Sequence, residues 1–311
     1  MQYSIGIDIG GTNSVMGIVD KKGVILFEAS VPTKAFPDIN DFIAAAFMKL
    51  SPEVKRLGIK NFKGIGIGAP NGNYYNGSIE FAPNLIWKGI IPLANLFTEK
   101  FNLESFVTND ANAAAIGEMM YGAAKGMNDF IMVTLGTGVG SGFVANGKMI
   151  YGHDGFAGEL GHTIAVRDGR ACGCGRKGCL ETYTSATGIV RTAHEFLKTQ
   201  TEGSLLREKE NLSSKDIYEA ALQGDPLALA IFDYTGKILG QSLADAVAIT
   251  SPEAIILFGG LAQAGPYIFQ PTRKYMEENL LIIYKNKIKL LPSELKESDV
   301  AILGAAALVW N

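Results

Sequence analysis

Cysteine is scarce in this sequence of 311 residues, and the few cysteines present are not spread as a disulfide framework would be. All three lie between Cys172 and Cys179, so their number is odd and they share one short segment. Such a cluster excludes a disulfide scaffold and indicates a metal or redox site. The sequence also lacks any apolar run near the roughly 20 residues that cross a bilayer. It has no basic start followed by an apolar stretch, so we expect neither a membrane span nor a signal peptide.

A strong excess of one charge is missing as well. Lysine and arginine number 28 against 31 aspartate and glutamate, a net charge of −3. This balance argues against a dedicated nucleic-acid binder, which usually carries a basic excess. The hydrophobic fraction of 47% excludes a disordered chain. We therefore expect a soluble, cytoplasmic α/β protein whose partners are small molecules, with no nucleic-acid or membrane partner.

Glycine is abundant and clustered, with 37 residues. Residues 5–20 predict a strand, a glycine-rich turn and a second strand, and the pattern returns at 130–145. We interpret this as a weak internal repeat of two similar α/β lobes. No serine-rich, proline-rich or charged linker separates them. We place the first lobe at 1–112, joined by a C-terminal helix over 298–311, and the second at 113–297.

The remaining predicted elements follow from apolar periodicity and capping signals. We expect strands at 24–31, 65–69, 106–108 and 254–258 and helices at 38–50, 111–121, 225–249 and 300–310. Ser298 and Asp299 are the expected caps of the last helix. Residues 71–92 are expected to form ordered loops, and 200–214 an exposed polar loop.

Both glycine-rich turns are candidate anion sites. The turns, Gly10-Gly11-Thr12-Asn13 and Gly136-Thr137-Gly138-Val139-Gly140, would let backbone N–H groups converge on a phosphate. Asp8 precedes the first turn and could hold Mg²⁺ through water molecules. Neither turn is a P-loop, because no Gly-Lys-Ser/Thr follows. A single such turn fits a plain hairpin equally well, but two in repeated lobes suggest a nucleotide held between them.

The cysteine segment predicts a metal site. His162, Cys172, Cys174 and Cys179 supply the four ligands of a structural tetrahedral Zn²⁺ site. The alternative is that the thiols are free and His162 is unrelated. A thioredoxin-like redox motif has another spacing, and a nucleic-acid zinc finger would need a second ligand pair before a helix.

Three carboxylates are candidates for substrate contacts. Glu159 and Glu181 flank the cysteine segment, and with the second nitrogen of His162 they could grip a polyol, although each alone fits a surface charge. Asp110 follows a strand where a helix begins, which suits a general base held ionised by the helix dipole. The pattern alone favours a plain helix cap at Asn109 or Asp110.

Taken together, these motifs resemble the ROK family (repressor, open reading frame, kinase), and specifically its sugar-kinase branch. The resemblance covers essentially the whole chain and rests on Asp8-Ile9-Gly10-Gly11-Thr12, Asn109-Asp110, Leu135 to Gly140, Glu159-Leu160-Gly161-His162, Cys172 to Glu181 and Gly259-Gly260.

The resemblance implies an actin-like ATPase fold of two ribonuclease-H-like lobes with a nucleotide and sugar cleft between them. It implies ATP-dependent phosphorylation of a hexose or N-acylhexosamine, with Asp110 as catalytic base, bound Mg²⁺ and a structural Zn²⁺ on the four ligands above. The sugar-binding residues would be Asn84, Asn109, Asp110, Glu159, His162 and Glu181. The nucleotide-binding residues would be Asp8, Gly10, Gly11, Thr12, Asn13, Thr137, Gly138, Gly259 and Gly260. The C-terminal helix would fold back on the first lobe, and a homodimer is expected.

Glucose is the first expectation because Glu159-x-x-His162 and Ala82-Pro83-Asn84-Leu85 look most like glucokinase members; fructose, mannose, allose and N-acetylhexosamines stay open. The loop 70–77 departs from the family pattern, which leaves its role open.

Three other functions make different demands on the sequence. A sugar-responsive repressor would need an added N-terminal DNA-binding module, yet residue 5 already begins the first strand. A non-catalytic sensor or a filament-forming actin relative would not need Asp8 and Asp110. A polyphosphate donor would need a basic cleft, and the candidate residues are too scattered to decide: Lys125, Lys148, Arg167, Arg170, Arg176 and Lys177.

Overall fold

The computed structural model describes residues 2–201 and 203–310, which form two compact units. Unit 1 comprises the residues up to 128, the segment 142–158 and the residues from 293 onward; unit 2 comprises 129–141 and 159–292. The lobe boundary expected at residue 112 falls inside helix α3 (Asp110–Tyr121), and the structure keeps the whole of α3 in unit 1.

Unit 1 is built on a five-stranded sheet with the order β3-β2-β1-β4-β8. The strands are β1 (Tyr3–Ile9), β2 (Ser14–Asp20), β3 (Ile25–Val31), β4 (Phe62–Gly68) and β8 (Ser105–Thr108). Strands β1, β4 and β8 run parallel, whereas β1 and β2 form an antiparallel hairpin around the first glycine-rich turn. The turn therefore lies at the carboxyl end of β1, where ligands of open α/β sheets usually bind.

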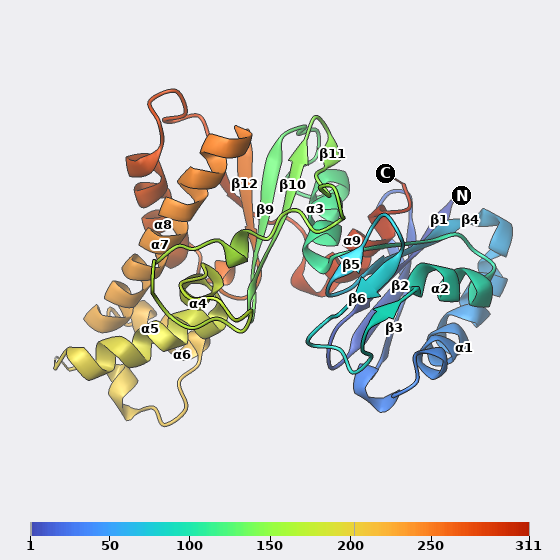
Figure 1. The fold of residues 1–311 in the computed structure, drawn as a ribbon, viewed down its shortest axis with the longest axis horizontal. Helices are drawn as coiled ribbons and strands as arrows, with labels where there is room; N and C mark the ends of the chain where they lie inside the picture. Colours follow the sequence, from blue (N-terminus) through green and yellow to red (C-terminus); the bar gives the residue numbers. More distant parts are fainter. Residues whose placement is uncertain (1, 202, 311) are drawn as a thin grey trace. The chain divides into compact units, whose positions relative to one another are not determined.

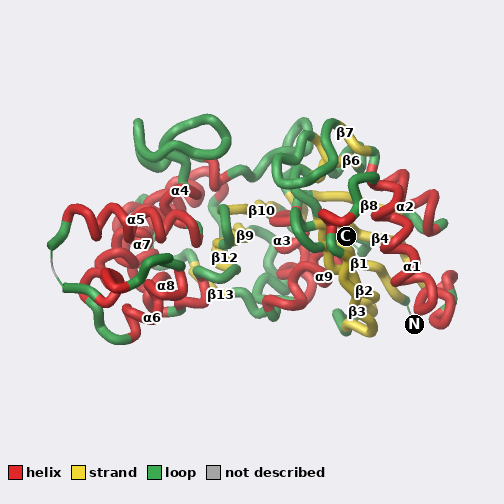
Figure 2. Tube along the Cα trace, turned by 90° about the horizontal axis from the view of Figure 1, so that it is seen from below, coloured by secondary structure: helices red, strands yellow, loops and turns green. Residues whose placement is uncertain are grey.

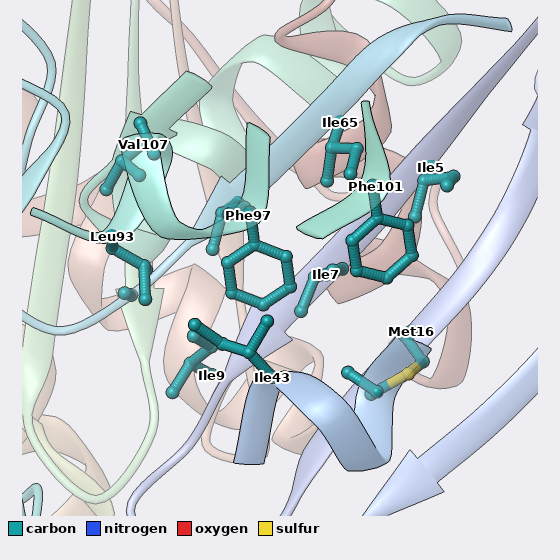
Figure 3. Close-up of a cluster of buried hydrophobic side chains, with 14 of the residues drawn as sticks. Ile5, Ile7, Ile9, Met16, Ile43, Ile65, Leu93, Phe97, Phe101 and Val107 are labelled. Carbon is teal, nitrogen blue, oxygen red and sulfur yellow. The ribbon is translucent and has the colours of Figure 1, made fainter. Parts of the chain in front are cut away.

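One face of this sheet carries a dense apolar core. Ile5, Ile7 and Ile9 alternate along β1 and are at most 1% exposed. They pack with helices α1 (Ile39–Leu57) and α2 (Leu93–Phe101), whose buried aromatic rings include Phe97 and Phe101 (Figure 3). Strand alternation thus sends the isoleucines to one side of β1 and leaves Gly6 on the other.

The opposite face receives helix α9 (Glu297–Ala307) in close contact, with α3 beside it (Figure 1). A β-carbon at Gly6 would lie 2.1 Å from the carbonyl oxygen of Ile302, and one at Gly66 only 1.8 Å from that of Ala305. Only glycine permits the helix backbone to approach these two strands so closely. This packing fixes the carboxyl ends of β1, β4 and β8 in position relative to the start of α3.

The second sheet has the order β11-β10-β9-β12-β13. Its strands are β9 (Phe130–Leu135), β10 (Val139–Ala145), β11 (Lys148–Met149), β12 (Ala254–Phe258) and β13 (Lys289–Pro292). Strands β9, β12 and β13 run parallel, as β1, β4 and β8 do, and β10 and β11 form an antiparallel pair. The predicted internal repeat is therefore visible as two sheets with the same strand pattern.

Apart from β9, the start of β10, β12 and β13, unit 2 is mainly helical, as expected for the second half of the chain. Its helices are α4 (Glu181–Thr184), α5 (Ala186–Thr199), α6 (Ser214–Leu222), α7 (Pro226–Thr250) and α8 (Pro266–Asn279), and the last four gather together (Figure 2). Asp225 caps α7 through the N–H groups of Leu227 and Ala228, as the Asp-Pro signal predicts. Within the described part of the chain, no helix combines the length and apolar character needed to cross a membrane.

Several expectations need correction. Helix α1 continues past Pro52 to Leu57 instead of ending at 50. The region 71–92 contains three short paired strands: β5 (Gly72–Asn73), β6 (Ser78–Glu80) and β7 (Ile90–Ile91). Within the stretch expected as a polar loop, 205–208 form a short 3₁₀ turn with Leu206 buried, and residue 202 lies outside the described residues. Helix α9 begins before its predicted caps, because the N–H groups of Asp299 and Val300 both bond the carbonyl of Lys296.

Candidate functional site

The first glycine-rich turn is tight and lies beside Asn84. A β-carbon at Gly10 would be 2.5 Å from the carbonyl oxygen of Asn13, and one at Gly11 would be 2.6 Å from that of Asn84. Thr12 and Asn13 are exposed. The structure therefore brings a predicted sugar-binding residue next to predicted phosphate-binding residues within unit 1.

Two aspartates converge at the carboxyl ends of the parallel strands in unit 1. Asp8 is the last residue but one of β1, and Asp110 begins α3 after β8. A β-carbon at Gly68 of β4 would lie 3.2 Å from Asp8 Oδ1 and 3.7 Å from Asp110 Cα. Burial, and secondarily the negative charge of Asp110, raises the pKa of Asp8 to about 7. Paired carboxylates in one place shift each other in this direction.

Asp110 is both a helix residue and an accessible carboxylate. Asn109 is the cap of α3, its side chain accepting the N–H of Ala111 at 2.9 Å, and Asp110 Oδ1 accepts the same N–H at 2.8 Å. Asp110 reaches solvent, yet protein atoms crowd around it, and this desolvation raises its pKa against the lowering effect of the backbone N–H bonds. Asn109 therefore shares the N–H of Ala111 with Asp110 Oδ1, so the start of α3 does not depend on the Asp110 carboxylate alone.

The second glycine-rich turn is held by groups from elsewhere in unit 2. The N–H of Gly140 donates to Thr134 Oγ1 at 3.1 Å, which closes the turn between β9 and β10. At the start of α5, the N–H of Ala186 bonds the carbonyl of Gly136 at 2.8 Å, and Thr187 Oγ1 bonds that of Thr137 at 2.9 Å. These contacts fix the turn from outside its own hairpin.

Gly259 and Gly260 join this second turn, because they follow β12, which pairs with β9. Gly259 has φ of 99°, and a β-carbon there would lie 2.7 Å from the carbonyl oxygen of Leu135 at the end of β9. The N–H of Leu261 bonds that same carbonyl at 3.2 Å. The predicted nucleotide-binding residues of unit 2 thus gather at the carboxyl ends of β9 and β12.

The four predicted metal ligands lie together. Their donor atoms, from His162, Cys172, Cys174 and Cys179, are within 4.8 Å of one another. Cys174 Sγ and Cys179 Sγ are 3.6 Å apart, and Cys172 Sγ is 3.7 Å from His162 Nδ1. A zinc ion with thiolate ligands at about 2.3 Å places neighbouring ligand atoms about 3.7 Å apart. The cluster therefore fits a tetrahedral ion, and it presents Nδ1 of the imidazole to that ion.

The cysteine loop is shaped by short backbone contacts. The N–H of Cys172 bonds the carbonyl of Arg176 at 2.9 Å, and Leu180 N–H bonds that of Thr163 at 2.9 Å. A hydrogen bond from the backbone of Arg176 lowers the pKa of Cys174 to about 6, whereas burial raises that of Cys172 to about 12. Because thiolates are the metal ligands, binding at Cys172 must release a proton.

Glu181 links the cysteine cluster to the second turn. Its Oε1 lies 3.0 Å from Cys172 Sγ and 3.7 Å from His162 Nδ1. A β-carbon at Gly138 would lie 2.8 Å from Glu181 Oε2. Glu159 is exposed and its carbonyl accepts the N–H of His162 at 3.0 Å. Unit 2 therefore brings Glu159, His162 and Glu181 into one neighbourhood. In unit 1, Asn84 lies against Gly11 after β1, and Asn109 and Asp110 follow β8.

Comparison with known proteins decides the family. The sequence profile of the ROK family matches residues 4–311. The chain belongs to the ROK family. It is 37% identical to a glucokinase of Halalkalibacterium halodurans (89% of this chain, 86% of the relative) and 33% identical to one of Thermotoga maritima (98% and 96%). It is also 30% identical to a xylose repressor of Bacillus subtilis, covering 99% of this chain but 77% of the repressor.

Solved ROK structures agree with the architecture. A ROK family glucokinase from Streptomyces griseus, in complex with glucose and AMPPNP, is 34% identical and superposes with a TM-score of 0.80 over 98% of both chains. A ROK hexokinase from Thermus thermophilus is 26% identical, with a TM-score of 0.82 over 99% of this chain. The expected actin-like ATPase fold is therefore confirmed for this ROK chain.

The sequence patterns did not reveal the residues that support the site from behind, and they named Arg170 only as a candidate for a basic cleft. Arg170 is a buried cation beside the cysteine loop, and Thr134 and Thr187 fix the second turn. Arg170 bonds side chains 22 and 25 positions away, so no short spacing pattern could reveal it. The only signal was an arginine two residues before the first cysteine of a ROK cysteine segment.

Proposed function

We propose that this protein transfers the γ-phosphoryl group of ATP to glucose, giving glucose 6-phosphate and ADP. Glucokinases are its relatives at 33–37% identity, and a related structure holds glucose with AMPPNP. The observation that carries the proposal is the placement of Asp110. Its carboxylate is exposed at the start of α3, close to Asp8, and Asn109 shares with it the capping of the Ala111 N–H.

Asp110 is the proposed general base. Phosphoryl transfer needs positioning and charge neutralisation more than covalent chemistry, and one carboxylate must take the proton of the attacking hydroxyl. Desolvation raises the pKa of Asp110 and so makes it a better proton acceptor. The backbone hydrogen bond from Ala111 and the N-terminal end of α3 act in the opposite direction and stabilise the ionised form that a base requires.

The other site residues receive roles by position. Asn84, Asn109, Glu159, His162 and Glu181 are the proposed hydroxyl-binding side chains, with His162 using Nε2 because Nδ1 faces the cysteines. The turns at Gly10, Gly11, Thr12 and Asn13 and at Thr137 and Gly138 are the proposed phosphate-binding segments. Gly259 and Gly260 are proposed to lie next to the adenosine.

Two metal ions belong to this proposal. Zn²⁺ would bind His162, Cys172, Cys174 and Cys179 and would cross-link the loop, so that His162 and Glu181 stay in place. A four-ligand site has no open position, which makes this ion structural. Mg²⁺ would neutralise phosphate charge, and Asp8 is the carboxylate that would hold its water shell.

The molecular context is also proposed. Units 1 and 2 correspond to the two lobes of the fold, with α9 belonging to the first. A cytoplasmic homodimer is expected from the family resemblance, and light scattering of the purified protein would test the oligomeric state.

A sugar-responsive regulator is the second candidate, favoured by the xylose repressors at 30–31% identity. Those proteins are longer than this chain, which covers 77% of their length. A regulator would bind sugar without turnover, so kinetics separate the two candidates.

The deciding experiment is an ADP-release assay with Mg-ATP against glucose, fructose, mannose, allose and N-acetylhexosamines. We expect the highest kcat/KM with glucose. Preference for another sugar would correct the substrate and keep the reaction. If folded protein released no ADP with any of these sugars, the ATP-dependent kinase would be rejected. The assay would then be repeated with polyphosphate in place of ATP. Calorimetry with glucose and xylose would test whether the protein binds sugar as a sensor.

A further inference from the structure

Arg170 is a buried cation whose every N–H donor is used. Its side chain is only 6% exposed. Nε donates to Glu195 Oε1 at 2.9 Å, and the two terminal nitrogens donate to Glu195 Oε2, Thr192 Oγ1 and the carbonyls of Thr182 and Gly188, at 2.5–3.1 Å. Arginine carries five such donors in a rigid fork, and here all five find acceptors.

These acceptors tie together two helices of unit 2. Thr182 belongs to α4, whereas Gly188, Thr192 and Glu195 belong to α5. Tyr183 completes the arrangement, because its ring lies 4.3 Å from the guanidinium carbon and its hydroxyl accepts the N–H of Arg170 at 2.9 Å. We call the junction of α4 and α5, at residues 184–186, the α4–α5 corner. Arg170 bonds both helices and so fixes this corner.

The backbone of Arg170 begins the cysteine loop. Its carbonyl accepts the N–H of Gly178 at 2.8 Å, next to Cys179, and Cys172 lies two residues farther along the chain. Both ends of the loop are therefore attached to the residue that fastens the α4–α5 corner.

The same corner holds the second glycine-rich turn. Ala186 and Thr187 at the start of α5 bond the carbonyls of Gly136 and Thr137. Glu181 at the start of α4 approaches Cys172 on one side and Gly138 on the other. A shift of the corner would move the turn, Glu181 and the cysteine loop together.

Stability alone is a poor explanation for such a residue. Removing a cation from water is costly, and well-packed apolar side chains often stabilise a fold as well as a buried ion pair does. What arginine supplies is directional: a planar fork that fixes several acceptors at once, which lysine cannot reproduce.

We infer that Arg170 is a positioning residue that holds the cysteine loop, Glu181 and the Gly136–Gly138 turn in one arrangement, so that the sugar-binding and phosphate-binding parts of unit 2 are set by a single side chain. The assignment of those parts rests on the proposed function. The connection itself rests on the hydrogen bonds above and involves unit 2 alone.

The test compares R170K with E195Q. R170K keeps the charge but loses the carbonyl contacts to α4 and α5, whereas E195Q weakens the ion pair and keeps those contacts. Because loss of an orienting partner typically costs 10- to 100-fold, R170K should raise KM for both glucose and ATP about tenfold. E195Q should change either KM less than about threefold, since the Glu195 side chain is 55% exposed.

Two further readouts separate positioning from general damage. Zinc content should be the same in R170K and the unmodified protein, and hydrogen exchange of amides 136–140 and 186–188 should accelerate in R170K only. The exchange result does not depend on turnover, so it stands if the unmodified protein proves inactive and the proposed function fails. If R170K does not fold, T192V tests the same connection, because it removes the hydroxyl of α5 that accepts from the Arg170 guanidinium at 2.9 Å.

The inference is overturned if the folded variant, R170K or T192V, leaves both KM values and the exchange of 136–140 unchanged. It is equally overturned if R170K loses zinc in proportion to its loss of substrate affinity, because Arg170 would then act only through folding of the cysteine loop.

Discussion

The two glycine-rich turns occupy equivalent places in two similar sheets, yet their surroundings differ. The turn at Gly10 to Asn13 follows β1 and lies beside the carboxylates of Asp8 and Asp110. The turn at Gly136 to Gly140 follows β9 and is fastened from outside by α5 and by Glu181. The turn in unit 1 is accompanied by carboxylates that can exchange protons. The turn in unit 2 is held in place by contacts from other segments.

This difference suggests a division of labour. Carboxylates with raised pKa values in unit 1 are suited to moving a proton. The cysteine cluster and Arg170 in unit 2 are suited to holding polar groups at fixed positions, because hydrogen bonds from several segments hold the α4–α5 corner in place. Variants in unit 1 should therefore lower kcat, whereas variants in unit 2 should raise KM.

The largest expected effect is that of Asp110→Asn. The amide cannot accept the substrate proton, so kcat with glucose should fall by about 10²–10⁴-fold. Single-turnover kinetics measure the rate, and calorimetry with AMPPNP and the thermal midpoint serve as controls that should stay close to the unmodified values. A near-normal rate would show that Asp110 only supports α3, and the comparison between the units would lose its basis.

Cys174→Ser should have the next largest effect, and on binding rather than turnover. Loss of one thiolate opens the four-ligand cluster, and zinc content, measured by plasma emission, should fall well below one per chain. KM for glucose should rise about 10- to 100-fold, because His162 and Glu181 lose their support. The exposed His194 of α5 offers a matched control, since H194Q should retain zinc. Absence of zinc from the unmodified protein would refute the metal site.

Much of this organisation was predictable from the sequence because it depends on local patterns. Alternating isoleucines predicted β1, the Asp-Pro pair predicted the start of α7, and the spacing of His162 and the cysteines predicted their cluster. These signals reflect short-range chemistry: capping, strand alternation and ligand sets.

What escaped prediction depends on distant partners. Arg170 bonds Glu195 across 25 positions, and α3 joins unit 1 because Gly304 of α9 lies against Ala113. The caps proposed for α9 were wrong because Ser298 bonds the adjacent Asp299 instead, and the helix begins at the preceding turn. Tertiary packing decided each of these points, and a single sequence carries no record of it.

A matched pair of glycine variants compares the turns directly. In G138A the new β-carbon would meet only the flexible carboxylate end of Glu181, at 2.8 Å, so the fold should persist while KM for glucose rises about tenfold. In G11A it would meet the backbone carbonyl of Asn84, at 2.6 Å, and we expect a loss of about 1–3 kcal/mol in the free energy of unfolding. Denaturant titration and steady-state kinetics of both variants give the two numbers. If both variants changed the free energy of unfolding and KM by similar amounts, the two turns would be supported in the same way.

The smallest effect concerns the charge of Asp8. The pKa of Asp8 is about 7 in the folded chain against an ordinary 3.8, so between these values the folded state binds more protons than the unfolded state. Stability must then fall as the pH rises from about 4 to about 7 and stay lower above it. Asp8→Asn removes this titration. Without Mg²⁺, the thermal midpoint of the variant minus that of the unmodified protein should therefore be about 2–4 °C larger at pH 8 than at pH 5. Scanning calorimetry at the two pH values measures it, with D20N at the end of β2 as a control that should show no such increase. A constant difference would place Asp8 in a normally solvated setting, and the two units would then no longer be distinguished by the environment of their carboxylates.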